Sequence, residues 1–144
     1  MIEKKANPIP QGKYVPATRF GDLIVTAGMT PRKNGQLIQT GRVLKDAPLE
    51  DYKDAVRQAA ENALTAARNQ LAEDERIVRV LSMTVYVNAE DGFTAHAKVA
   101  DFASDFLNEE LGGASPMART SIGIASLPGN APVEISLICG AGKA

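Results

Sequence analysis

The spacing of apolar positions changes along the chain, and each change marks a predicted element. Residues 23–29 form an apolar, β-branched run, which is typical of a buried strand. Asn34-Gly35 predicts a tight hairpin turn, with a second strand over residues 36–40. Residues 1–12 contain two prolines and a glycine, so we predict an extended arm there.

Two segments follow the period of an amphipathic helix. The first begins near Pro48, and its apolar stripe is rich in alanine, which allows a close approach to a neighbouring element. The second runs over residues 95–111 and ends at the glycine pair Gly112-Gly113. The stripe of the first helix comprises Tyr52, Ala55, Val56, Ala59, Ala60, Ala63, Leu64, Ala67 and Leu71.

Three further strands are predicted. Residues 76–87 are apolar on both faces over most of their length, which favours the middle of a sheet. Residues 119–127 and 133–139 form two closing strands, and residues 140–144 are expected to be a loose tail. The order β-β-α-β-α-β-β predicts one α+β domain over residues 1–144, with two helices on one face of a mixed sheet. Because the other face needs cover, we expect the chain to form homo-oligomers.

Composition narrows the possible chemistry. The 144 residues contain 16 Lys and Arg, 17 Asp and Glu, one His and one Cys, with a net charge of −1. This excludes intrachain disulfides and argues against Cys/His metal sites and a basic nucleic-acid surface, so we expect no metal and no cofactor. No apolar run approaches the roughly 20 residues that cross a bilayer. With no signal-peptide pattern either, a cytoplasmic location without membrane contact is expected.

Arg119 and Glu134 are the strongest candidates for a functional site, since each interrupts a strand of small or apolar residues. A guanidinium can bind a carboxylate through two parallel hydrogen bonds. The alternative is that the two side chains pair with each other or face solvent. His96 is expected to be solvated, and Cys139 is expected to act as a small hydrophobic residue.

Several motifs resemble one known family along most of the chain. The most specific is Ala118-Arg-Thr-Ser-Ile-Gly-Ile-Ala-Ser-Leu-Pro128 followed by Val133-Glu-Ile135, and residues 12–16, 21–28 and 85–87 also match. These resemble the Rid family of reactive-intermediate (imine) deaminases, also called YjgF-like or L-PSP proteins. Residues 97–104 are more similar to a slightly longer, divergent branch of that family.

The resemblance implies a chorismate-mutase-like α+β fold, a homotrimer and clefts between subunits. It implies hydrolysis of 2-imino acids, or of their enamine tautomers, to 2-keto acids and ammonia, with a small carboxylate as ligand. In this frame Arg119 binds the substrate carboxylate, Glu134 positions the attacking water, and Tyr14 lines the cleft.

The chain also departs from the archetypal pattern of the family. Ala27 stands before Gly28 where those deaminases carry serine, and Ser121 replaces a frequent cysteine. Asp101 is the nearest counterpart of an asparagine, and all four residues are expected near the substrate. These departures leave open a non-catalytic trimer that binds a small carboxylate or acts as a chaperone. The endoribonuclease or translation-inhibitor role of some relatives is a weaker alternative, because the net charge argues against RNA binding.

Overall fold

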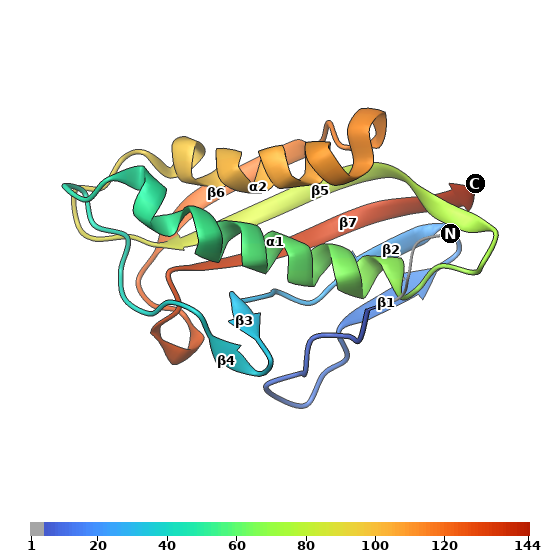
Figure 1. The fold of residues 1–144 in the computed structure, drawn as a ribbon, viewed down its shortest axis with the longest axis horizontal. Coiled ribbons are helices and arrows are strands. Elements are labelled where there is room, and N and C mark those ends of the chain that lie inside the picture. Colours follow the sequence, from blue (N-terminus) through green and yellow to red (C-terminus); the bar gives the residue numbers. More distant parts are fainter. Residues whose placement is uncertain (1–4) are drawn as a thin grey trace.

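A five-stranded mixed sheet, covered on one face by two helices, organises the computed structural model (Figure 1). The structure describes residues 5–144, so residues 1–4 of the predicted arm lie outside it. Residues 5–12 contain no helix or strand. None of the helices within residues 5–144 is long and apolar enough to cross a membrane.

The strand order in the sheet is β1-β2-β7-β5-β6, and β5 and β6 are its one parallel pair among the described residues. As predicted, the apolar strand of residues 76–87 lies inside the sheet, between β7 and β6. The bounds are β1 Ala17–Phe20, β2 Leu23–Thr26, β5 Glu75–Asn88, β6 Ala118–Ile124 and β7 Val133–Lys143.

The predicted hairpin turn is confirmed, but its strands are short. β3 (Arg32–Lys33) and β4 (Gln36–Leu37) pair only with each other, in a sheet of their own. Asn34 and Gly35 have φ values of 55° and 82°. Two consecutive positive φ angles define the turn that joins two-residue hairpins, and Asn-Gly is the pair that adopts it with least strain.

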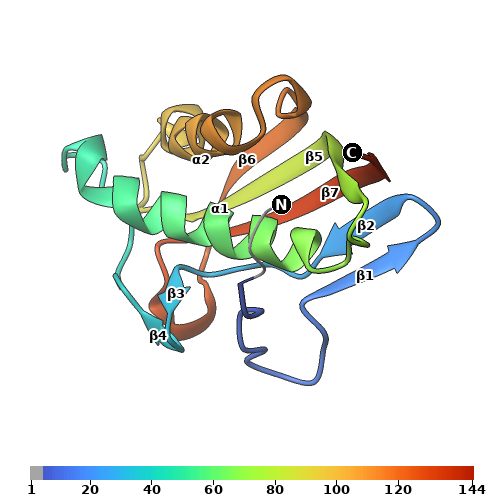
Figure 2. The ribbon, with the colours of Figure 1, turned by 45° about the vertical axis from the view of Figure 1, so that its right-hand side comes forward.

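Both predicted helices form, and they lie side by side on one face of the sheet (Figures 1 and 2). A single 3₁₀ turn, Leu49–Tyr52, leads into α1 (Lys53–Arg68). α2 (His96–Leu111) ends at Gly112, which has a φ of 54°. The alanine stripe of α1 is fully buried, as expected for a helix that approaches its neighbour closely. Ion pairs also join the two helices, including the pair between Arg57 and Glu109.

Two features of the sheet differ from the sequence prediction. β1 was not predicted, because its four residues alternate in burial and are too few to show a clear period. The tail predicted for residues 140–144 is wrong, because β7 continues to Lys143 and pairs with Glu75 of β5. The glycines there resemble a loop in composition, yet a Cβ at Gly142 would lie 2.8 Å from Cγ1 of Val78. Small residues therefore let Val78 lie over the strand.

The face of the sheet opposite the helices, here called the open face, carries exposed apolar side chains. Val25 and Ile138 lie opposite each other on β2 and β7, with 45% and 38% of their surfaces exposed. Leu23 and Ile122 on the same face are 49% and 42% exposed. Leu23, Val25 and Ile138 are neighbours in the strand register, and such an apolar patch is typical of a region covered by another protein chain.

Candidate functional site

Arg119 lies on the face of the sheet that packs against the helices. It is opposite Met83, which is fully buried in the core. Its Nη1 donates hydrogen bonds to Asp101 Oδ1 at 2.8 Å and Ser104 Oγ at 2.9 Å, and its Nη2 donates to the carbonyl of Ala97 at 3.2 Å. All three partners lie on α2, so this helix holds the guanidinium in one orientation.

Glu134 lies on the open face. It is opposite Tyr86 on β5, and its neighbours in β7, Val133 and Ile135, are fully buried on the helix side. Desolvation by burial raises the pKa of the Glu134 carboxyl above its usual value of 4.5. The carboxylate lies over Gly28, where a Cβ would come within 2.3 Å of Oε2.

A backbone bridge keeps Gly28 beside Glu134. The amide of Met29 donates to the carbonyl of Ile135 at 2.7 Å, and the amide of Ile135 donates to the carbonyl of Met29 at 2.9 Å. This bridge extends the pairing of β2 with β7 past the end of β2. Ala27 precedes the bridge and is half-buried, as is Gly28.

Arg119 and Glu134 therefore lie on opposite faces of the same sheet. The alternative in which they pair with each other is wrong, because the partners of Arg119 are all on α2. A small ligand on one face cannot contact both side chains of one chain, because the sheet separates them. The structure thus divides the candidate residues into an arginine group (Arg119, Asp101, Ser104) and a glutamate group (Glu134, Gly28).

The other candidates are placed as follows. Ser121 follows Arg119 by two residues on β6 and so shares its face. Tyr14 is 46% exposed, and its hydroxyl accepts a hydrogen bond from the amide of Gln11 at 3.0 Å. Within one chain, Tyr14 therefore packs on its own segment and belongs to neither group.

Sequence reasoning missed Ser104 and the carbonyl of Ala97. The signal was available, because Ala97, Asp101 and Ser104 are spaced i, i+4 and i+7, which places them on one face of a helix. What the sequence could not supply was the neighbour of that face. Only the packing of α2 against β6 shows that it is Arg119.

The single histidine and the single cysteine both pack against other parts of the fold. Cys139 is fully buried, which confirms its expected role as a small hydrophobic residue, and burial raises the pKa of its thiol to about 12. The expectation that His96 is solvated is wrong. It is half-buried, packs edge-on against Phe93 at 5.2 Å between ring centroids, and has Nε2 directly above Gly123.

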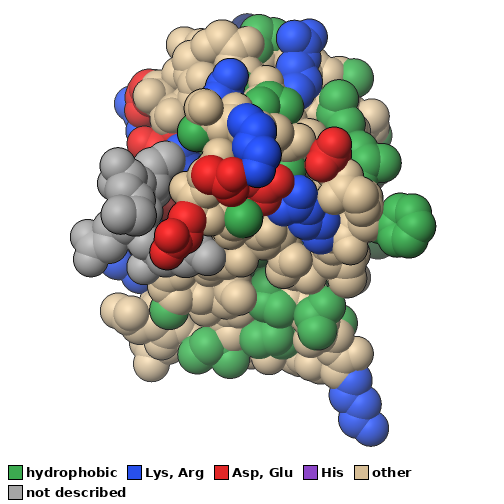
Figure 3. Space-filling view, turned by 90° about the vertical axis from the view of Figure 1, so that its right-hand side faces the viewer, with side chains coloured by type: hydrophobic (Ala, Val, Ile, Leu, Met, Phe, Trp, Pro, Cys, Tyr) green, Lys and Arg blue, Asp and Glu red, His purple; other side chains and the backbone are tan. Residues whose placement is uncertain are grey.

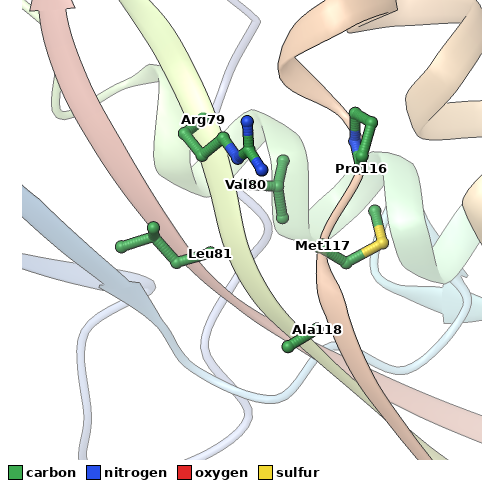
Figure 4. Close-up of a pocket in the computed structure, with 6 residues that line it drawn as sticks. All are labelled: Arg79, Val80, Leu81, Pro116, Met117 and Ala118. Carbon is green, nitrogen blue, oxygen red and sulfur yellow. The ribbon is translucent and has the colours of Figure 1, made fainter.

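Two surface hollows contain no residue of either group. One, of about 290 Å³, is formed by β5 and the segment that enters β6 (Figure 4). The guanidinium of Arg79 extends there toward Pro116 and Met117. Another, of about 420 Å³, lies between the two helices and the β3–β4 hairpin. Neither contains Arg119 or Glu134. Within residues 5–144, no three His, Cys, Asp or Glu side chains gather closely enough to hold a metal ion.

These features define an α+β protein with an arginine on an edge strand and a half-buried carboxylate on the opposite face. The chain belongs to the Endoribonuclease L-PSP family, whose model matches residues 4–140. The family predicted from the sequence motifs is thereby confirmed.

Individual relatives match this chain over most of their own length. The protein Atu1372 of Agrobacterium tumefaciens, of unknown function, is 31% identical, with a TM-score of 0.82 over 96% of this chain and 87% of that one. A proposed endoribonuclease of Shewanella oneidensis is 25% identical, with a TM-score of 0.85 over 96% and 91% of the two chains. Protein TCP17 of Trypanosoma cruzi is 28% identical over 95% of this chain and 86% of its own length.

The structure of the YjgF gene product of Escherichia coli shares the fold as well, with 22% identity and a TM-score of 0.65 over 93% and 92% of the two chains. The α+β architecture expected from the resemblance is therefore confirmed. The expectation that the protein does not act on nucleic acid receives no support, because the family and the Shewanella relative are both named for RNA cleavage.

Proposed function

We propose that the protein hydrolyses reactive 2-imino acids, or their enamine tautomers, to 2-keto acids and ammonia, in a site shared between two copies of the chain. The observation that carries this proposal is the separation of Arg119 and Glu134 on opposite faces of one sheet. A carboxylate-binding arginine and a carboxylate base act on the same small molecule only if they come from different copies.

Such a site has consequences for the assembly. Contact between the helix-side edge of one copy and the open face of the next joins two different surfaces, which is a heterologous contact. Heterologous contacts close into rings when the rotation allows. The resemblance implies a ring of three, and the exposed apolar residues on the open face supply surface to bury in it. A homotrimer therefore joins the arginine group of each subunit to the glutamate group of its neighbour.

The reaction follows from the properties of the two groups. Arg119 binds the substrate carboxylate and holds the imine carbon in place. Glu134 accepts a proton from water as the water oxygen forms a bond to that carbon, and the C=N electron pair moves to nitrogen. In the carbinolamine formed from the protonated imine, Glu134 returns this proton to the nitrogen, the C–N bond breaks, and ammonia leaves. The hydroxyl group then loses its proton to Glu134 as the C=O bond forms. The raised pKa of Glu134 makes it a stronger base than an exposed carboxylate.

A structural neighbour agrees with a small ligand of this class. TdcF of Escherichia coli, 22% identical to this chain, has been determined with bound serine. Serine carries both a carboxylate and an amino group, as the hydrated imino acid does.

The test generates 2-aminoacrylate or a branched imino acid in situ and follows its decay with and without the protein. We expect acceleration by the wild type and a loss of about 10²–10⁴-fold in Glu134→Gln, which keeps the side-chain size but removes the base. Arg119→Ala should abolish saturation by substrate. A folded trimer that accelerates none of several imino acids would exclude the proposal. Carboxylate binding without turnover would instead identify a non-catalytic binding protein.

A second candidate is RNA cleavage, which the names of the family and of the Shewanella relative favour. The distribution of charged side chains does not favour RNA binding. On the face shown in Figure 3, basic and acidic side chains lie next to one another, without forming a basic stripe. Cleavage of a labelled RNA that persists in Glu134→Gln and Arg119→Ala would indicate a separate activity. Tight, salt-dependent RNA binding would do the same.

A further inference from the structure

We infer that Asp101 is a specificity-determining residue, which makes the Arg119 subsite prefer ligands with a positively charged nitrogen next to the carboxylate. This inference rests on the proposed function, because it assumes that Arg119 binds the carboxylate of a small ligand. It goes further by stating how the site distinguishes its substrate from its product.

The contacts of Arg119 show how a ligand and Asp101 share the same guanidinium. A guanidinium has five N–H groups. Both N–H groups of Nη1 are used by Asp101 and Ser104, and one N–H group of Nη2 is used by Ala97. Among the described residues, two N–H groups remain, one on Nε and one on Nη2. A ligand carboxylate can accept both of them while Asp101 stays in place.

Because Asp101 stays, the subsite differs in charge from an isolated arginine. The positive charge of Arg119 is balanced by a carboxylate only 2.8 Å away. A purely anionic ligand is attracted by Arg119 but repelled by Asp101. A zwitterionic ligand places its cationic nitrogen near Asp101, whose side chain is 61% exposed and keeps acceptor sites open to solvent. The pair therefore favours zwitterions over anions.

This preference separates the substrate of the proposed reaction from its product. A protonated 2-imino acid carries a cationic =NH₂⁺ group beside its carboxylate. In the 2-keto acid a carbonyl oxygen occupies the same position, and its lone pairs face the Asp101 carboxylate. The carboxylate is common to both molecules, so Arg119 alone does not distinguish them. Asp101 consequently favours substrate binding and product release.

The experiment measures binding, so it does not depend on turnover. Isothermal titration compares 2-aminobutanoate, a stable zwitterion, with 2-oxobutanoate, an anion with the same carbon skeleton. We expect the wild type to bind 2-aminobutanoate about fivefold to tenfold more tightly than 2-oxobutanoate. This is the size of effect expected from one additional charge interaction at a solvent-exposed site. Asp101→Asn should bring the ratio of the two affinities close to one, mainly through tighter binding of 2-oxobutanoate.

Asp105→Asn is the matched control. It removes the same charge from the same helix, at an exposed residue that is not a partner of Arg119, and should leave the ratio unchanged. Ser104→Ala should weaken the binding of both ligands by the same factor. It removes a contact that orients Arg119 but leaves the charge of the subsite unchanged. If Asp101→Asn fails to fold, Asp101→Ser replaces it.

Three results would overturn the inference: a wild type that binds neither ligand, a wild type that prefers 2-oxobutanoate, or a ratio that Asp101→Asn leaves unchanged. Failure of the proposed function is recognised differently, by the absence of imine hydrolysis. If both ligands bind with the expected ratio but no imino acid is hydrolysed, the specificity of the subsite stands and the deaminase proposal does not.

Discussion

Replacing Gly28 by alanine tests directly whether the position of the Glu134 carboxylate matters. The added methyl would lie 2.3 Å from Oε2 of Glu134, 2.8 Å from Cδ and 3.1 Å from Cγ. The backbone of Gly28 lies outside the positive-φ region, so it accepts alanine without strain. The substitution therefore acts through space alone, on the end of one flexible side chain.

The size of the effect follows from these distances. An ordinary contact between the methyl carbon and a carboxylate oxygen is about 3.4 Å, so the oxygen must retreat by about 1 Å. A displacement of about 1 Å in a reacting group lowers the rate by about 10²-fold. Because a half-buried side chain moves more easily than a packed core, the loss of unfolding free energy should stay below the roughly 1–3 kcal/mol of core overpacking.

The assay compares kcat/KM for imine hydrolysis with the urea unfolding midpoint. Gly113→Ala is the control, because a Cβ there has no neighbouring heavy atom within 4 Å and its φ lies outside the positive region. Combining Gly28→Ala with Glu134→Asp should restore part of the activity, since the shorter side chain leaves room for the methyl. Full activity in Gly28→Ala would refute the role assigned to Glu134, and so would equal loss of activity in the Gly113→Ala control.

Three further predictions concern the folded chain. Arg19 hydrogen-bonds Glu75 and lowers the pKa of its carboxyl to about 2, so the stability from this pair is complete above pH 4.5 and lost as the pH falls toward 2. Glu75→Gln should flatten that part of a plot of urea stability against pH, and an unchanged slope would contradict the assignment. Cys139 should resist thiol reagents at pH 8 until urea unfolds the protein, whereas stoichiometric labelling of the native state would show that it is not buried. Leu107→Ala should reduce the free energy of unfolding by about 2–5 kcal/mol in urea titration, because the side chain is fully buried, and a loss below about 1 kcal/mol would show that α2 packs loosely.

Local patterns in the sequence determined much of the fold. The apolar run of residues 76–87, the two helical stripes and Asn34-Gly35 each predicted an element that the structure contains. These signals are reliable because each depends on neighbours within a few residues, where side-chain spacing and backbone angles decide the outcome. The motif around Arg119 and Glu134 likewise identified the family before any fold was known.

Only the tertiary structure determined how those elements pair and pack against one another. Alternation within a strand predicts which of its residues share a face of the sheet. Strand pairing and helix packing decide whether that face lies under the helices or on the open side. Register and helix packing placed Arg119 against Asp101 and Ser104 on one side of the sheet. The same registers placed Glu134 over Gly28 on the other side. Because such contacts join residues distant in the chain, no local pattern in the sequence reveals them.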